Sequence, residues 1–450
     1  MSSLSVTTAR SGTLPTDVHP FDVGVHDRLS AGPLLLLGLQ NVFGMTGMFV
    51  FPALLGHVFS LAPADIAYLY GATFIACGVG TILQSALLLR LPIVQGPYAG
   101  SFGALLAIGH VPGVGLGGAY GSFAVAAGIW VLLSIPIRGR SLIVTLARWL
   151  DLPLLGGTMV MLIIIQIASV SLPNWIGQPG RPGFGLPNLA AGLVAVLAIV
   201  ALMRWSGGML RRGAILIGLA GGTLVYMLFQ PISFAPVVAA PWLVEPRLFP
   251  VGFAVRADLV AMFLLVLLAG AMGSMALCRT VADWAEEPLT PGRVAEGVLG
   301  AGIGALVAAL FGGFSTIAYP DNIGMLRATR VASRYATLAA GVLLIVLGAC
   351  VKFDMLLVVI PAAVISAAAT LLFGIVFMHG VAMLARVEWS DRELIAGGLG
   401  LLVGLGGLFV APETLGAMPL LLRLVIQQPV ISGGLTLVMF YALLRDREQA

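Results

Sequence analysis

Long apolar runs set the main constraint on this chain. From Gly32 almost to the C-terminus, mostly apolar stretches follow one another with short polar breaks, many of them about 18 or more residues long, enough to cross the hydrocarbon core of a bilayer. The composition agrees, because 59% of the residues are hydrophobic, only 9% are charged and the mean hydropathy is +1.06. Soluble domains carry roughly 25% charged residues. The sequence therefore predicts a polytopic, all-α integral membrane protein surrounded by lipid, without a sizeable soluble domain.

The apolar runs and their polar breaks predict about 14 spans. They lie near 32–56, 65–86, 93–111, 118–137, 152–172, 188–203, 213–230, 258–277, 294–312, 315–326, 332–350, 355–378, 393–411 and 428–444. An even number of spans places both termini on one side of the membrane. If that side is the cytoplasm, residues 1–30 form a cytoplasmic tail and most basic residues also lie inside, as the positive-inside rule requires. Of the 23 basic residues, only five fall outside: Arg181, Arg247, Arg256, Lys352 and Arg423. We therefore expect a multi-pass protein of the inner (cytoplasmic) membrane.

Two of the predicted spans are unusual. Residues 91–109 and 314–330 each begin with an extended, proline-bearing stretch that favours a short β-strand, and each passes through glycines into a short helical stretch. Such breaks are tolerated in a bilayer only where the backbone faces protein or a cavity. They are the third and tenth spans, which correspond when the chain is divided into two sets of seven, and an odd repeat length inverts the second set. Paired broken spans in inverted repeats indicate a transporter's solute site, although close-packing glycines are the alternative.

Polar residues inside the spans are the candidates for contacting a solute. Asp321 lies at the break of the tenth span, where its carboxylate can accept hydrogen bonds from ring N–H groups, or can cap the following half-helix. The neighbouring Asn322 either contacts the solute or ties the broken backbone together. In the first span, Gln40 and Asn41 face the same choice between solute contact and hydrogen bonding to other helices.

The third span carries a matching set of candidates. Gln95, Tyr98 and Ser101 surround its break, and Phe102 presents a ring for stacking on a planar solute or for ordinary packing. With the residues of the tenth and first spans, they form the predicted binding site for a small planar solute.

Several classes of function find no support in the sequence. The five histidines lie in the N-terminal tail or at predicted span ends (His19, His26, His57, His110 and His379). The three cysteines lack metal-ligand spacing. The basic residues are scattered through short loops instead of clustering with aromatic residues, which argues against a nucleic-acid partner. We therefore expect no enzyme activity, no cofactor and no metal site.

The tenth span also carries a specific motif. Residues 322–330, NIGMLRATR, fit the pattern N-x-G-x-x-x-x-T-[RKG], and the chain resembles the nucleobase–ascorbate transporter family, also called the xanthine/uracil permeases, almost end to end. Further likenesses are GLQN in the first span, LPIVQG in the third and IPAAVISAAATLLFG in the twelfth. The resemblance implies two inverted seven-span repeats, with a core domain from 31–137 and 255–350 and a gate domain from 138–231 and 351–446. It also implies a homodimer, a solute bound between the third and tenth breaks, an elevator-like cycle, and coupling to H⁺ or Na⁺.

Three departures from the family pattern bear on specificity. The motif is preceded by Asp321 instead of Gln, Glu or Pro, and Asn41 replaces the histidine of a Gln-His pair. The eighth span of the family carries a substrate-binding glutamate in a pattern like A-E-x-x-G, and here Gly270 stands in that place. The loss removes a charge, a hydrogen-bond acceptor and a proton carrier, and is expected to free volume for a bulkier or more anionic solute, such as an oxidised purine or an aromatic carboxylate.

The first functional hypothesis is therefore a secondary active transporter of nucleobases or related planar heterocycles. Two alternatives stay open at this point. One is a transporter of a small organic or inorganic anion on the same fold, and the other is a channel or sensor.

Overall fold

The computed structural model describes residues 21–109, 114–137, 141–149, 153–177, 179–180, 183–207, 210–211, 213–320, 322, 326 and 329–444. Seven helical segments in this part of the chain are long and apolar enough to cross a membrane. They comprise α3 (Pro63–Ile82) with η2 (Leu83–Leu87), α5 (Gly115–Ser134), α8 (Leu186–Trp205), α12 (Ala257–Trp284), α13 (Pro291–Phe311), α17 (Ala362–Leu384), and α18 (Asp391–Gly406) with η3 (Gly407–Phe409).

The first predicted span is bent. Helix α1 (Ala31–Phe43) is bent by 62° from the segment Gly47–Val58, which holds most of the short 3₁₀ helix η1 (Thr46–Phe49) and all of α2 (Phe51–Val58). Taken as one bent span, they make an eighth. Shorter apolar segments lie in α7 (Pro153–Ile176), α10 (Ala214–Met227), α15 (Arg334–Ala349) and α21 (Pro429–Leu443). The prediction of a helical, multi-pass membrane protein is confirmed. The count of 14 spans stays a prediction.

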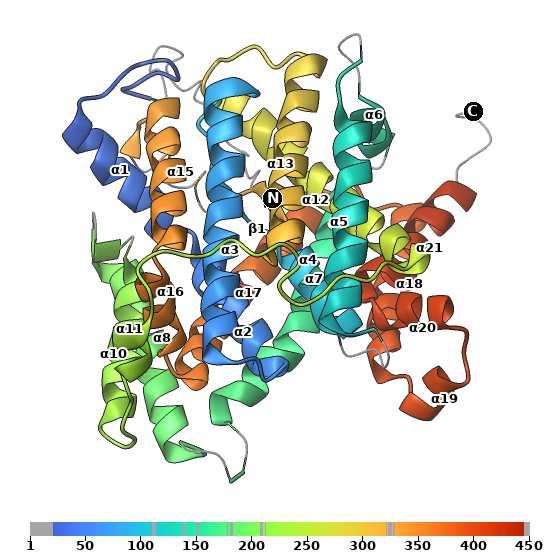
Figure 1. Cartoon of the computed structure of the whole chain (residues 1–450). Helices are drawn as coiled ribbons and strands as arrows, with labels where there is room; N and C mark the ends of the chain where they lie inside the picture. Colours follow the sequence, from blue (N-terminus) through green and yellow to red (C-terminus); the bar gives the residue numbers. More distant parts are fainter. Residues whose placement is uncertain are drawn as a thin grey trace, which may run out of the picture.

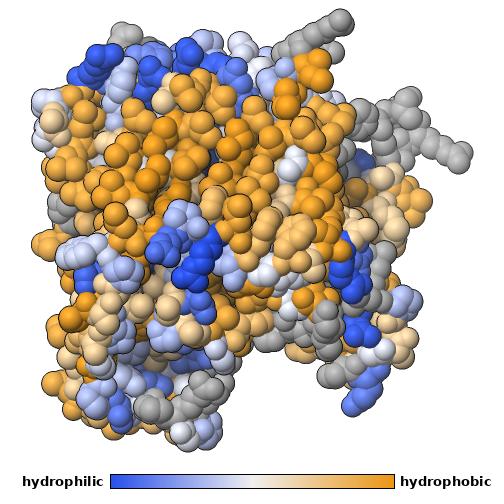
Figure 2. All heavy atoms as spheres, viewed as in Figure 1, coloured by the Kyte–Doolittle hydropathy of each residue, from blue (hydrophilic) through white to orange (hydrophobic). Residues whose placement is uncertain are grey.

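The remaining helices are short. They are α4 (Ala99–Gly109), α6 (Leu142–Trp149), α11 (Ala235–Ala239), α16 (Val351–Val358), α19 (Pro412–Gly416) and α20 (Leu420–Gln427). Figure 2 shows apolar side chains over much of the face in view, with hydrophilic residues gathered along its upper edge. Leucines exposed on α5, α8 and α18, such as Leu132, Leu197 and Leu402, fit a surface that meets lipid.

Small residues allow the helices to approach closely. A Cβ atom on Gly78 of α3 would lie only 2.7 Å from the carbonyl oxygen of Gly341 on α15, and one on Gly400 of α18 would lie 3.0 Å from that of Gly433 on α21. Lipid does not drive apolar helices together as water does, so backbone contact of this kind is a main source of helix association in membranes.

The helices pack in two groups (Figure 1). Helices α1, α3, α5, α12, α13 and α15 contact one another, and so do α7, α8, α10, α17, α18 and α21. The segment between α11 and α12 runs across α3, α13 and α5, where the N–H of Phe249 donates to Leu310 and that of Ala254 to Gly117. The boundaries of a core domain (31–137 and 255–350) and a gate domain (138–231 and 351–446) stay a prediction.

Two short strands join the third and tenth segments. Strand β1 (Gln95–Pro97) pairs antiparallel with β2 (Thr316–Ala318), with Gly96 opposite Ile317. Hydrogen bonds from Tyr98 N to Ser315 O (2.7 Å) and from Tyr319 N to Val94 O (2.9 Å) extend the pairing at both ends. Helix α4 follows β1. Most of the stretch after β2 lies outside the described residues, so the helical half of the tenth span stays a prediction.

Candidate functional site

The strand pair fixes which side chains face which helices. Successive residues of a strand point to opposite faces. Ile317 points toward α12, where its Cγ2 atom would lie 3.2 Å from a Cβ atom on Gly270. Thr316 points to the other face, and its hydroxyl donates a hydrogen bond to the carbonyl of Ala301 on α13 (3.2 Å). The two breaks therefore meet between α12 and α13.

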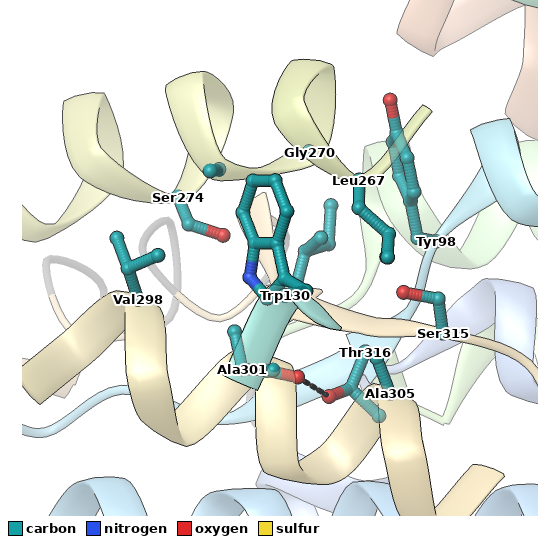
Figure 3. Close-up of a pocket in the computed structure, with 13 residues that line it drawn as sticks. Tyr98, Trp130, Leu267, Gly270, Ser274, Val298, Ala301, Ala305, Ser315 and Thr316 are labelled. Carbon is teal, nitrogen blue, oxygen red and sulfur yellow. Dashed lines mark hydrogen bonds between the residues drawn. The ribbon is translucent and has the colours of Figure 1, made fainter. Parts of the chain in front are cut away.

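A hollow lies beside this meeting point (Figure 3). It lies between α5, α12, α13 and β2, is partly open at the surface, and its volume of about 10 Å³ leaves room for about one water molecule. Its lining comprises Tyr98, Trp130, Leu267, Gly270, Ala271, Ser274, Val298, Ala301, Gly302, Ala305, Ser315, Thr316 and Ile317. Two of the predicted site residues, Tyr98 and Gly270, are therefore brought together here.

Tyr98 packs directly on Gly270. A Cβ atom on Gly270 would come within 3.1 Å of Tyr98 Cε1 and 3.4 Å of Tyr98 Cδ1. The expectation that the missing eighth-span side chain leaves free volume is therefore wrong in part, because the tyrosine ring occupies the space beside Gly270. The tyrosine side chain is 8% exposed, and Figure 3 shows its hydroxyl group pointing away from Thr316 and Ala301.

The polar groups in the hollow belong mainly to the second break and to α12. The N–H of Ala318 donates to Ser274 Oγ (3.1 Å), which ties β2 to α12 one turn after Gly270. Trp130 of α5 lies across from Ser274 and presents an aromatic ring to the hollow (Figure 3). A hydroxyl and an aromatic surface are the kinds of group that bind flat polar rings.

A second polar contact joins the first and tenth spans. Asn322 Nδ2 donates to Asn41 Oδ1 (2.7 Å), while Asn41 Nδ2 donates to the carbonyl of Leu37 (2.9 Å). Both asparagines are buried. Asn322 Oδ1 has no hydrogen-bond partner among the described residues. Hydrogen bonding to another span, one of the two roles considered for Asn41, is therefore observed, and solute contact through Asn322 Oδ1 stays a prediction.

Comparison with known proteins shows which family the chain belongs to. A model described as a permease family, Xan_ur_permease, matches residues 32–413. The chain belongs to the xanthine/uracil permease family. This membership confirms the resemblance based on the tenth-span motif, and it places the permease in a family of transporters.

Several relatives of the permease are named as transporters of nucleobases. It is 28% identical over 414 residues to the nucleobase transporter PlUacP of Paenibacillus larvae, with 90% of the permease and 93% of that protein covered. It is 28% identical over 431 residues to the uric acid permease PucJ of Bacillus subtilis, with 92% of the permease and 93% of PucJ covered. It is also 28% identical over 418 residues to the xanthine permease of Bacillus subtilis, with 90% of the permease and 92% of that protein covered.

Solved structures share the fold of the permease at low identity. SLC26A9 matches with a TM-score of 0.58 and 11% identity, covering 91% of the permease and 65% of that chain. The transmembrane domain of the cyanobacterial bicarbonate transporter BicA matches with a TM-score of 0.50 and 16% identity, covering 93% of the permease and 99% of that chain. These likenesses concern the fold alone.

The glutamines predicted for the site lie apart from the hollow of the permease. Gln95 is fully buried on the α3 side of the strand pair, where its Cγ atom would lie 3.2 Å from a Cβ atom on Gly80. Neither polar atom of the Gln95 side chain has a hydrogen-bond partner among the described residues, and the same holds for Gln40 Oε1. Buried amides that lack a protein partner are costly, by about 1–3 kcal/mol, and call for an explanation.

The other third-span candidates have partners within the permease. Ser101 Oγ donates to the carbonyl of Tyr98 (2.8 Å) at the start of α4. Phe102 stacks on Phe51 with ring centroids 4.9 Å apart and planes at 11°, and its edge meets Phe314. These contacts are structural, and solute contact by either residue stays a prediction.

Asp321, the predicted polar anchor, lies outside the described residues. Trp130, Ser274 and Thr316 line the hollow and were not predicted from the sequence. Ser274 could have been predicted from the sequence, because it lies four residues after Gly270 and so on the same face of a helix. Trp130 could not, since a tryptophan in an apolar span is equally consistent with packing.

Proposed function

We propose that the permease carries purine bases, in particular oxidised purines such as xanthine and uric acid, across the inner membrane by secondary active transport. The observation that carries this proposal is the membership of the xanthine/uracil permease family, with relatives named for uric acid and xanthine along nearly their whole length. The pairing of β1 with β2 beside a partly polar hollow supports a solute site at this place.

The side chains around the breaks suit a flat, polar solute. Tyr98 and Trp130 offer aromatic surfaces, and Ser274 offers a hydroxyl group. Asp321 and Asn322 are proposed as polar anchors at the tenth break, with Gln95, Ser101, Phe102, Gln40 and Asn41 as further members of the site. Because Gly270 supplies no carboxylate, the site repels an electron-rich or anionic purine less than a site with a glutamate there. This difference favours oxidised purines over uracil.

The transport cycle that we propose is elevator-like and coupled to H⁺ or Na⁺, in a homodimer. Helix α2, which packs against α3 of the first group, meets the second group through an aromatic contact, since Phe51 stacks against Phe373 of α17 with centroids 6.2 Å apart and planes at 24°. A flat apolar contact of this kind can slide without breaking hydrogen bonds, which suits relative movement of the two groups.

Counterflow in proteoliposomes tests the proposal. Vesicles loaded with unlabelled xanthine should accelerate the entry of labelled xanthine and labelled uric acid, and external uric acid should compete with xanthine better than uracil does. A channel or sensor gives no exchange acceleration. Exchange that is inhibited by benzoate or bicarbonate but unaffected by purines would support the small-anion alternative, whose only structural support is the fold shared with a bicarbonate transporter and with the murine anion transporter Slc26a9.

A further inference from the structure

Asp354 is the one acidic side chain that is buried among the described residues. It lies on α16 and is 1% exposed. The other carboxylates of the described part of the chain are exposed or partly exposed, as Asp65 at the start of α3 illustrates. An acid in this position is costly unless it has a partner or stays neutral.

No cation lies beside Asp354 in the described part of the permease. Its Oδ2 atom packs on α3, 2.8 Å from where a Cβ atom on Gly71 would lie, and its Oδ1 atom has no hydrogen-bond partner among the described residues. Lys352, on the same helix, is turned away, because its Nζ atom donates to the carbonyls of Val237 (3.2 Å) and Val238 (2.7 Å).

Few other titratable groups lie near Asp354 on the elements packed against α16. On α3 the nearby group is the Tyr70 hydroxyl, which donates to the carbonyl of Phe49 (2.7 Å). At the junction with α15 it is the thiol of Cys350, and α11 (APVVA) offers none. None of these groups supplies a positive charge, so the packing of α16 against α3 fits a neutral carboxylic acid and not a carboxylate.

The contacts of α3 connect this acid to the broken spans. Tyr70, next to Gly71, bonds to Phe49 at the end of η1. Within η1, the N–H of Gly47 donates to the hydroxyl of Tyr319 (2.8 Å), directly after β2. A shift of α3 against α16 can therefore be transmitted to the tenth break through these buried hydrogen bonds, by way of the bend in the first span.

We propose that Asp354 is the residue that binds the coupled proton in this permease. The proposal rests on the proposed transport function. When α16 separates from α3 and water reaches the carboxylate, the carboxylate takes up one proton from the solution. When the helices close, the acid is carried neutral, and it releases the proton when the site opens to the other side. Gly270 and Ser274 of α12 cannot bind the proton, because neither side chain titrates.

Transport measurements with Asp354→Asn test the proposal. Purified full-length permease in proteoliposomes is given labelled xanthine, with and without an inward proton gradient. In the wild type the gradient should drive accumulation. Asp354→Asn should lose this accumulation by at least tenfold, while exchange against internal xanthine stays within about twofold, because the amide mimics the neutral acid. The exposed Asp65→Asn serves as a matched control on α3 and should accumulate xanthine as the wild type does.

Three results would overturn the proposal. The first is Asp354→Asn with unchanged gradient-driven accumulation. The second is accumulation driven only by a Na⁺ gradient. The third is failure of Asp354→Asn to fold, because a neutral acid should tolerate an amide of the same size.

An infrared measurement separates this proposal from the transport function itself. A protonated carboxylic acid gives a carbonyl stretching band that should be present in the wild type and absent from Asp354→Asn. If the wild type does not exchange xanthine, the proposed function fails, and the infrared band still decides whether Asp354 holds a proton. Identical bands in both proteins would show that it does not.

Discussion

The ring of Tyr98 lies against Gly270, with Tyr98 Cε1 only 3.1 Å from the place where a Cβ atom on Gly270 would be. An aromatic side chain from the third predicted span thus occupies the space beside α12, the eighth predicted span, where the family resemblance implies a carboxylate. Which side chains residue 270 can carry therefore depends on residue 98. The large ring of Tyr98 fits here because Gly270 has no side chain.

The first prediction concerns this pair. Gly270→Glu alone should destabilise the permease by about 1–3 kcal/mol, because the new side chain meets Tyr98 and Ile317. Adding Tyr98→Ala should recover most of that loss and improve competition by uracil, whose ring N–H groups would find an acceptor. Thermal melting in detergent and competition assays measure both effects. If Gly270→Glu alone melts and transports like the wild type, the ring does not limit the space at residue 270.

The second prediction concerns the contact between Asn41 and Asn322. A double-mutant cycle with Asn41→Ala and Asn322→Ala should give a coupling free energy of about 0.6–1.7 kcal/mol, between the average and the largest value found for hydrogen bonds between membrane helices. Equilibrium unfolding in mixed micelles measures it. Ser85→Ala and Thr337→Ala, which remove a separate buried contact of 2.7 Å between α15 and η2, serve as a control cycle. Additive effects of the two asparagine substitutions would mean that the contact does not stabilise the fold.

The third prediction concerns Gln95, whose buried amide lacks a protein partner. Gln95→Leu should leave the melting temperature of the solute-free permease unchanged or raise it, because an unsatisfied amide is removed. The increase in melting temperature caused by xanthine should disappear. Gln84→Leu is the matched control, since Gln84 Nε2 donates to the carbonyl of Gly297, so its loss should destabilise the protein and spare xanthine binding. A normal xanthine shift in Gln95→Leu would remove Gln95 from the site.

The fourth prediction concerns Asp321 at the tenth break. Asp321→Asn keeps the size of the side chain and part of its capping ability but removes the charge. Xanthine binding should fall by at least tenfold, or about 1.4 kcal/mol, with little loss of folded protein. Isothermal titration and size-exclusion chromatography measure the two quantities. Unchanged affinity would leave Asp321 with a structural role only.

The fifth prediction concerns topology. In a background with Cys350→Ser, a cysteine placed beside Arg330 should react with an impermeant thiol reagent only from the cytoplasmic side, and one placed beside Lys352 only from outside. The two native cysteines Cys77 and Cys278 are buried and should not interfere. Labelling beside Arg330 in intact cells would contradict the count of 14 spans and the predicted orientation.

The sequence alone was sufficient for the membrane class and the family. The length of an apolar run is a local property, and the cost of burying charges in lipid is high enough that run length and the distribution of arginines predict spans and orientation. The motif in residues 322–330 is local as well, and the family match confirmed it. The two breaks were also visible, because prolines and glycines interrupt the runs at 91–109 and 314–330.

The tertiary structure decided which of the polar and small residues meet. Asn41 and Asn322 are 281 residues apart in the chain and still share a hydrogen bond. The tyrosine ring on Gly270 and the burial of Asp354 against α3 also depend on how the helices pack. The sequence placed Asp354 in a short polar break between two spans, where nothing distinguished it from a surface acid. Its burial follows from Gly71, whose missing side chain lets α16 approach α3, and a contact of that kind depends on helix packing and not on any local pattern of residues.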